Sequence, residues 1–444
     1  MSPMKKEVTL AMSQKQINRY HVIMDSLEGK VTVAQAANAM GISERQVTRL
    51  RNGVKEEGAA FLIHGNTNRP PSHAVTEENR AEIVSLYRSD KYQGSNFLHF
   101  SELLSEHENI SLGYTAVRKT LRAAGLESPK KRRKSKPHHR RKRKAQEGLL
   151  TQMDATPYEW FGGEEKFALH GGIDDATGHI TGLYMTENEC LRGYFEVVRQ
   201  TIVNNGGVPI GIYADRHTIF RSPNADKLTV EEQLAGKQVA DTQFGRAMRE
   251  LGINLIAARS PQAKGRIERL WGTLQSRLVI EFRIHGIQTV HHANAFLADY
   301  IPRFNEHFGV EPESAEKAYV PTNLDLDLIL CVKETRTVDN GGVFSFYGKS
   351  WIVVGENLPG KSKIEVIASA TKGIIALSNG QIFEVLPYIK PKRINRPRAA
   401  RKTSVPSDDH CWRRGKPLIP LYSSDLVDSE VHAILNDIFL AKYA

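Results

Sequence analysis

Hydrophobic and polar positions change their spacing twice along this chain of 444 residues. Up to about residue 128, apolar residues recur three and four positions apart, the period of amphipathic helices. From 149 to about 278, short apolar runs and helical segments alternate, which predicts an α/β domain with a mixed sheet. From 337 to 389, short apolar runs separated by turn residues predict a small β-barrel. The chain is therefore expected to be multidomain.

These shifts in pattern, together with Gly- and Pro-rich stretches and a run of charge, divide the chain into six expected parts. They are a helix-turn-helix module at 1–65, a second helix-turn-helix-like module at 73–128, a basic linker at 129–148, a mixed α/β core at 149–320, a small β-barrel at 335–390, and a basic tail with a terminal helix at 391–444.

The first helical module has the turn chemistry of a helix-turn-helix. Thr32 is expected to cap a short helix that closes at Gly41, and Ser43 to cap a second helix with Gln46 in an S-x-x-Q capping box. The small and apolar core positions of the motif are Ala37, Val47 and Leu50. The second helix exposes polar side chains that we predict to contact DNA, namely Arg45, Gln46, Arg49 and Arg51. A plain helical hairpin with a polar face is the alternative.

In the second module, the sequence predicts one helix after Thr76 and another near 96–107. A third predicted helix ends at Gly125 and resembles a second recognition helix. In the central domain, strands are expected at 149–153, 167–173, 180–185, 210–214 and 253–257, with helices at 189–204 and 242–251 and one more after 257.

Three carboxylates stand where such a domain places ligand sites. Asp154 is expected to end the first strand and Asp215 the fourth, while Glu268 lies on the helix after the fifth. Carboxylate oxygens are ligands that suit Mg²⁺. Taken singly, each has a plainer interpretation as a turn residue, a cap or a surface ion pair. Asp174 and Asp175 are rivals that adjoin a predicted turn, and the third rival, which precedes a helix as a cap would, is Asp241.

The helix that carries Glu268 is expected to begin at Ser260 and Pro261. Its apolar stripe, which leaves Glu268 outside it, consists of Ile267, Leu270, Leu274 and Leu278. Lys264 precedes Glu268 by one turn and is predicted to meet a DNA phosphate, with further DNA contacts from Arg266 and Gln275.

The net charge of +11 resides in one short segment. Residues 130–144 hold eleven Lys or Arg and no acid, which leaves 50 basic and 50 acidic residues elsewhere. Such a block attracts a polyanion, although a soluble linker is the alternative. The residues predicted to contact DNA are Lys130, Lys131, Arg132, Arg133, Lys134, Arg140, Arg141, Lys142, Arg143 and Lys144.

Other classes of protein fit poorly. The chain has no apolar run of membrane-spanning length, and its start lacks the apolar core of a signal peptide, so we expect no membrane association. Its three cysteines are far apart and form neither a zinc spacing nor a disulfide framework, which indicates a reducing cytoplasm.

Several blocks resemble one known family. They are T-Q-F-G-R-A-M-R-E-L-G-I-N-L-I-A-A-R-S-P-Q-A-K-G-R-I-E-R-L-W-G-T-L-Q-S-R-L at 242–278, Q-M-D-A-T-P at 152, I-D-D-A-T-G-H-I at 173, Y-A-D-R-H-T at 213 and R-F-N-E-H-F at 303. Over about 15–390, the chain resembles DDE transposases of bacterial insertion sequences, most closely the ISNCY type, whose catalytic core is integrase-like and ribonuclease H-like.

The resemblance implies that Asp154, Asp215 and Glu268 are the catalytic triad and hold two Mg²⁺ ions, for which Mn²⁺ substitutes. It implies binding of terminal inverted repeats, cleavage and strand transfer of double-stranded DNA into a target, and a homo-oligomer on DNA in the bacterial cytoplasm, at the nucleoid. The chain departs from compact integrases in having 52 residues between Asp215 and Glu268, with a polar insertion at about 221–240, and in lacking an N-terminal His/Cys zinc module. A non-catalytic, sequence-specific DNA-binding regulator and a structure-selective nuclease are the alternatives.

Overall fold

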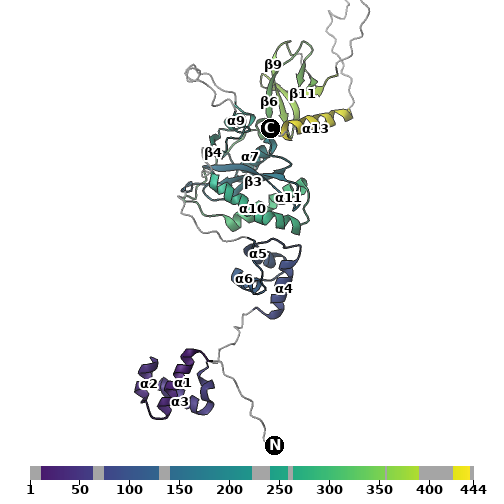
Figure 1. The fold of residues 1–444 in the computed structure, drawn as a ribbon. Helices are drawn as coiled ribbons and strands as arrows, with labels where there is room; N and C mark the ends of the chain where they lie inside the picture. The colour runs from purple at the N-terminus through teal and green to yellow at the C-terminus, as the bar shows by residue number, and fades with distance from the viewer. Residues whose placement is uncertain are drawn as a thin grey trace, which may run out of the picture. The chain divides into compact units, whose positions relative to one another are not determined.

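The structure is a computed structural model in which two compact units are recognised, Met1–Glu82 and Ile83–Ala444 (Figure 1). It describes residues 12–63, 75–129, 141–222, 241–258, 264–355, 358–389 and 424–440. Several predictions therefore lie outside the described residues: the basic positions from Lys130 to Arg140, most of the insertion, the helix start at Ser260 and Pro261, and the basic run after residue 389.

The first unit contains the expected helix-turn-helix. After α1 (Gln14–Leu27) come α2 (Val33–Met40), α3 (Glu44–Glu57) and a short 3-10 helix, Gly58–Leu62. Gly41 closes α2 in the left-handed conformation at φ 63°, and the side chain of Ser43 caps α3 by accepting from Gln46 N. The reciprocal capping box, however, forms at Thr32 and Gln35 instead of at Ser43. The module is held by a core of Ile23, Ala36, Ala37, Val47 and Val54.

The second helical module follows its predicted boundaries closely. It comprises α4 (Glu77–Arg88), α5 (Phe97–His107) and α6 (Tyr114–Ala123). The Thr76 hydroxyl accepts from Asn79 N at the start of α4, and Gly125 takes φ 77° after α6.

The centre of the second unit is a five-stranded mixed sheet in the order β3-β2-β1-β4-β5. Its strands are β1 (Thr151–Tyr158), β2 (Phe167–Asp174), β3 (Ile180–Thr186), β4 (Gly211–Ala214) and β5 (Asn254–Ala257). β1 pairs with β2 antiparallel and with β4 parallel, and β4 pairs with β5 parallel. The predicted mixed sheet is therefore confirmed.

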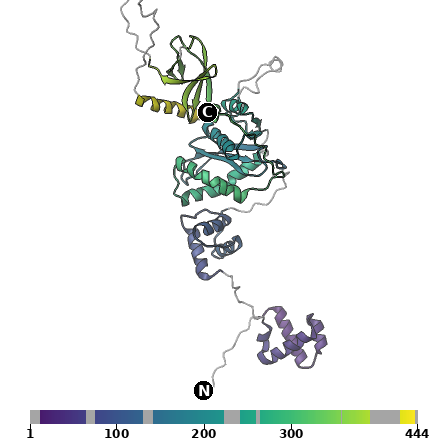
Figure 2. The same ribbon diagram turned by 180° about the vertical axis from the view of Figure 1, so that it is seen from behind.

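Helices cover both faces of this sheet (Figures 1 and 2). On one face, α7 (Leu191–Asn205) and α9 (Gln243–Glu250) share a core in which Phe195 stacks on Phe244. On the other face lie α10 (Gly265–Ile284) and α11 (Val290–Phe308). The predicted apolar stripe of α10 is buried in that second core: Ile267, Leu270, Leu274 and Leu278 are each at most 4% exposed.

After α12 (Leu326–Ile329), the chain forms a second sheet, antiparallel and six-stranded, in the order β6-β9-β10-β11-β8-β7. Its strands are β6 (Val332–Thr337), β7 (Val343–Phe346), β8 (Lys349–Val353), β9 (Lys363–Ser369), β10 (Gly373–Ser378) and β11 (Gln381–Pro387). Arg336 Nε donates to Ser345 O between the edge strands β6 and β7, so the sheet is nearly closed.

Two details of this C-terminal part were predictable. Asn379 and Gly380, at φ 49° and 81°, form the hairpin turn between β10 and β11. The expected terminal helix is α13 (Ser424–Leu440), which adds Ile434 and Phe439 to the core that also includes α7. Among the described residues, every helix is too short or too polar to span a membrane.

One buried group makes the stability of the second unit depend on pH. His170 on β2 is fully buried, with its Nε2 accepting from Cys190 N and its Nδ1 3.3 Å from Tyr184 O. Burial lowers the pKa of this imidazole from 6.5 to about 4. Because the unfolded chain then binds the additional proton, the stabilisation is complete above pH 6.5 and is lost as the pH falls toward 4.

We predict that the free energy of unfolding of this unit falls by about 3 kcal/mol over that interval because of His170 alone. Tryptophan fluorescence in urea measures it, since all four tryptophans lie within 83–444. His170→Gln should be less stable at pH 7 and should lose this part of the pH dependence, whereas the exposed His292→Gln should keep it. An unchanged pH dependence in His170→Gln would contradict the assignment.

Candidate active site

The sheet brings two of the three predicted carboxylates together. Gln152 on β1 is in register with Tyr213 on β4, and Asp154 and Asp215 each follow two residues later. Asp154 does not end its strand, as the sequence suggested, because β1 continues its antiparallel pairing with β2 as far as Tyr158. What ends at Gln152 is the parallel pairing with β4. Both aspartates therefore lie just past the paired segment, on neighbouring strands.

Within the described residues, one cation lies between these two aspartates. The Lys264 ammonium is 2.7 Å from Asp154 Oδ1 and 3.7 Å from Asp215 Oδ2. Lys264 is only 7% exposed, so its charge is poorly screened by water. In the structure the Lys264 ammonium bridges two carboxylates and reduces their mutual repulsion by offsetting one of their two negative charges. The contact of Lys264 with a DNA phosphate stays a prediction.

Glu268 lies on the same face of α10 as this lysine. Residues 264, 268, 271 and 275 are spaced at intervals of four, three and four, so they line one side of the helix. Three of the four contact β1: besides Lys264, Trp271 Nε1 donates to Asp154 Oδ2 at 3.3 Å, and Gln275 Nε2 to Thr156 Oγ1 at 3.4 Å. Glu268 stands between Lys264 and Trp271 and is exposed. Its carboxylate thus belongs to the side of α10 that faces Asp154.

The start of α10 is fastened by a buried polar network. Gln152 Oε1 accepts from Ile267 N at 3.3 Å, and Gln152 Nε2 donates to Asp175 Oδ1 at 2.8 Å. Asp175 is fully buried and also accepts from Arg266 Nε at 2.7 Å. Because a buried carboxylate is stable only when paired and hydrogen-bonded, these contacts fix the first turn of α10 against β1.

Several residues predicted to contact DNA also have contacts inside this unit. Asp175 pairs with Arg141 as well as Arg266, and it accepts from the backbone N–H of Lys144. Arg143 donates to Ala176 O at 3.0 Å, whereas Lys142 forms an exposed ion pair with Glu313 at 2.9 Å. The contacts to Asp175 arise because its buried carboxylate needs compensating charge, a demand that the charge run alone does not reveal, and the DNA contacts stay a prediction.

The rival carboxylates have structural roles. Asp174 accepts from Gly148 N, Ala176 N and Thr177 N and so closes the turn after β2, and burial raises its pKa. Asp241 forms an exposed pair with Arg249 and does not cap α9, because Thr242 accepts from Gly245 N in that position.

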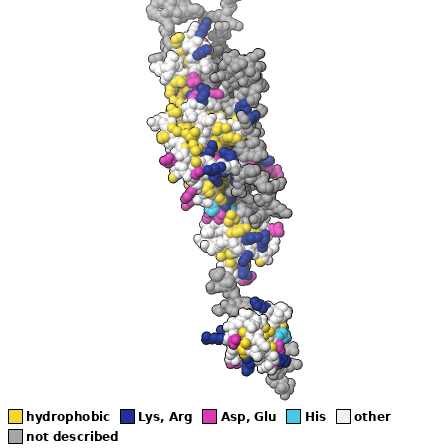
Figure 3. All heavy atoms as spheres, turned by 90° about the vertical axis from the view of Figure 1, so that its left-hand side faces the viewer, with side chains coloured by type: hydrophobic (Ala, Val, Ile, Leu, Met, Phe, Trp, Pro, Cys, Tyr) yellow, Lys and Arg dark blue, Asp and Glu magenta, His cyan; other side chains and the backbone are white. Residues whose placement is uncertain are grey.

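In the first unit, three of the residues predicted to contact DNA are exposed on α3, namely Arg45, Gln46 and Arg49, while Arg51 is half-buried. Figure 3 shows Lys and Arg side chains in dark blue on the surface of the described residues. The sequence reasoning missed Gln152 and Trp271. The signal for Trp271 was its spacing of seven from Lys264, two helical turns on the same face, whereas no local signal marked Gln152.

The donor set suits a divalent cation that prefers oxygen. Asp154 and Asp215 share the positive charge of Lys264, and Glu268 lies on the face of α10 that also carries Lys264. Mg²⁺ takes few protein carboxylates and keeps several waters, so the two aspartates fit its coordination and Glu268 stays the predicted third ligand.

Comparisons with known proteins agree with a DNA-binding chain. The family described as winged helix-turn helix matches residues 19–81. The chain is 36% identical to the transposase for insertion sequence IS1202 of Streptococcus pneumoniae, over 75% of this chain and 77% of that protein. It is 30% identical to y4bF of Sinorhizobium fredii, which is named as a transposase, over 92% of this chain and 93% of that protein.

Two solved structures were also matched. The simian T-cell lymphotropic virus intasome with PP2A regulatory subunit B56 gamma matches with a TM-score of 0.29 and 14% identity, over 69% of this chain and 96% of that chain. The HTLV-2 integrase catalytic core domain in complex with magnesium matches with a TM-score of 0.24 and 18% identity, over 34% of this chain and 83% of that chain.

Because the Lys264 ammonium and a metal ion compete for the same two carboxylates, we predict that Lys264→Gln binds Mg²⁺ about tenfold more tightly. Isothermal titration calorimetry measures the change. Arg269→Gln is the matched control, since it removes the same charge from an exposed position on the same helix and should leave the affinity within about twofold. Equal or weaker Mg²⁺ binding by Lys264→Gln would contradict the competition.

Proposed function

This chain belongs to the transposases of insertion sequences. From that premise we propose that it is a DDE-type enzyme that binds the terminal inverted repeats of its own element and catalyses Mg²⁺-dependent cleavage and strand transfer of DNA. The observation that carries the proposal is the pair of aspartates, Asp154 and Asp215, which share one cation at the edge of the sheet. Glu268 on the facing helix completes the proposed triad.

In this proposal, Asp154, Asp215 and Glu268 hold two Mg²⁺ ions, for which Mn²⁺ substitutes. When bound, such a pair of ions activates the attacking water or 3′-hydroxyl and stabilises the leaving oxygen of an in-line displacement at phosphorus. The Trp271 N–H holds the second oxygen of Asp154 and so orients its carboxylate. The Lys264 ammonium, once displaced from the aspartates, is one helical turn from Glu268 and meets a DNA phosphate there.

The sheet order supports assigning 149–320 to a ribonuclease H-like catalytic core. The strands β3, β2 and β1 pair antiparallel, and β4 and β5 then follow, with β4 parallel to both β1 and β5. The nearly closed sheet begins with β6 at Val332, three residues before the predicted barrel at 335–390, and is assigned as the small barrel that follows such a core. The remaining proposed parts keep their predicted boundaries: helical modules at 1–65 and 73–128, a basic linker at 129–148, and a tail at 391–444.

Binding of the repeats is assigned to the helical modules. Arg45, Gln46 and Arg49 are exposed on α3, the second helix of the helix-turn-helix, which is the helix that enters the major groove in this motif. The basic linker supplies sequence-independent attraction to phosphates. Joining two ends of an element requires two active sites, so we propose that the protein acts as a homo-oligomer on DNA in the bacterial cytoplasm, at the nucleoid.

Asp154→Asn, Asp215→Asn and Glu268→Gln should each lower the rate of Mg²⁺-dependent cleavage of repeat-bearing DNA by at least about a thousandfold, or ~4 kcal/mol of transition-state stabilisation. Each removes a negative charge from the metal site while keeping the side-chain shape. Cleavage and joining are followed with labelled duplexes that carry the inverted repeats flanking the coding region, and chelation with EDTA should abolish both steps.

Asp241→Asn is the matched control, because this exposed carboxylate pairs with Arg249, is not one of the proposed metal ligands, and its loss should leave the rate unchanged. All variants should bind DNA as wild type does. Normal cleavage by the three site variants would refute the triad. Specific binding without cleavage by the wild-type protein would instead identify a DNA-binding regulator.

Arg49→Ala should weaken binding to the terminal repeat by about 1–3 kcal/mol, while binding to unrelated DNA changes by less, because a base contact carries sequence discrimination. Fluorescence anisotropy at fixed salt with the two duplexes measures both affinities. Lys15→Ala, at an exposed position of α1 in the same unit, should reduce the two affinities equally or not at all. Equal losses on both duplexes for Arg49→Ala would remove it from base recognition.

A further inference from the structure

The second half of α10 is docked on the second helical module. Arg277 pairs with Glu102 of α5 at 2.7 Å, and Arg283 donates to Gln93 O at 2.8 Å in the loop before α5. These contacts lie well away from the proposed triad, since the 13 residues from Glu268 to Glu281 span about 20 Å of helix. Whatever chemistry occurs at this interface is therefore separate from the aspartate pair.

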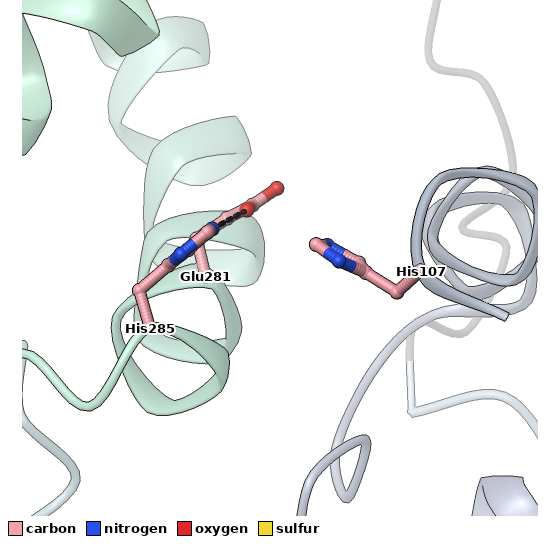
Figure 4. A group of neighbouring side chains, drawn as sticks. All are labelled: His107, Glu281 and His285. Carbon is pink, nitrogen blue, oxygen red and sulfur yellow. Dashed lines mark ion pairs between the residues drawn. The ribbon is translucent and has the colours of Figure 1, made fainter.

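Three potential metal ligands converge between the two helices. Glu281 lies in the last turn of α10 and His285 is the residue that caps this helix, while His107 at the end of α5 faces them, as Figure 4 shows. One ligand atom from each lies within 4.8 Å of the other two. Glu281 is 5% exposed, His107 is half-buried and His285 is exposed.

The buried atoms of this group lack the partners that burial requires. Among the described residues, neither Glu281 Oε2 nor His107 Nε2 has a hydrogen-bond partner, although both are buried. His285 Nε2 is 4.0 Å from Glu281 Oε2, which is an ion-pair distance but too long for a hydrogen bond. Leaving a buried carboxylate oxygen unsatisfied is unfavourable, because burial removes its hydrogen bonds to water. A ligand that contacts both atoms would remove this cost.

The other oxygen of the same carboxylate is already held. Glu281 Oε1 lies 3.2 Å from Nε2 of His99, a side chain that is 1% exposed. A carboxylate that binds a metal is commonly oriented in this way by a second hydrogen bond. His99 thus fixes Glu281 with its free oxygen directed at the space between the helices.

We propose that His107, Glu281 and His285 form a Zn²⁺ site that joins α5 to α10. Two imidazole nitrogens and one carboxylate oxygen are a zinc ligand set, whereas Mg²⁺ prefers oxygen ligands alone. Tetrahedral coordination at about 2.0–2.1 Å requires neighbouring ligand atoms about 3.3 Å apart. The rings of His107 and His285 close the remaining distance by side-chain rotation, because neither ring is fully buried.

With three protein ligands, the fourth position of the tetrahedron would be filled by water. The site would nevertheless act structurally, because its ligands come from two packed elements. It binds the folded interface and not the unfolded chain, so zinc would stabilise the docking of the second helical module on the helix that carries Glu268. The inference does not depend on the proposed DNA chemistry, because none of its three ligands belongs to the triad.

The test uses the full chain in an Asp154→Asn, Asp215→Asn background, which removes the other carboxylate pair as a metal site. After treatment with a chelator, ZnCl₂ is titrated in and bound zinc is measured by elemental analysis, with Co²⁺ absorption reporting tetrahedral geometry. We expect one tightly bound equivalent per chain. His107→Ala and His285→Ala should each lower the affinity by more than about a hundredfold, since loss of an outer partner alone costs 10–100-fold.

His291→Ala is the matched control, because it removes an exposed histidine from the same unit and should retain the zinc. Zinc should also raise the melting temperature of the Asp154→Asn, Asp215→Asn protein, but not that of the same protein with His285→Ala. Because His285 is exposed, its replacement should not disturb folding. No bound zinc, or equal zinc in the parent and both ligand variants, would overturn the proposal.

Discussion

Two carboxylates on neighbouring strands must share a positive charge, and the rest of the active-site architecture depends on this constraint. The parallel pairing of β1 with β4 places Asp154 beside Asp215, where their charges would repel without a cation between them. Lys264 supplies that charge from α10, and the same face of the helix carries Glu268 and Trp271. A metal ion that binds the aspartates must displace the lysine, so metal binding and release of a cation for DNA are linked.

The position of α10 is therefore as important as the acids themselves. Its first turn is held by Gln152 and by Asp175, which is buried and draws in Arg141 and Arg266. Arg141 and Arg266 add to the positive charge of the sequence, yet both pair with Asp175 and help to hold the start of α10. Charge counted along the sequence thus overstates the number of basic groups available to DNA.

The sequence predicted what local chemistry determines. The caps at Thr32 and Ser43, the Asn379-Gly380 hairpin, the apolar stripe of α10 and the order of strands and helices all follow from neighbouring residues. It also predicted that Asp154 and Asp215 could converge, and the parallel pairing of β1 with β4 brings them together, while their catalytic role stays a prediction. It did not predict the Lys264 bridge or the Arg266–Asp175 pair, because these join segments 110 and 91 residues apart along the chain. The group of His107, Glu281 and His285 was not predicted for the same reason, since His107 comes from another module.

We propose above that Asp154 and Asp215 form a cation site from which Lys264 is displaced. A crystal structure of the protein on a terminal-repeat duplex with Mn²⁺, using the anomalous signal of the metal, would decide this. We expect Mn²⁺ between Asp154, Asp215 and Glu268, with the Lys264 ammonium moved to a DNA phosphate. Mn²⁺ bound elsewhere, or Lys264 still bridging the aspartates on bound DNA, would contradict it.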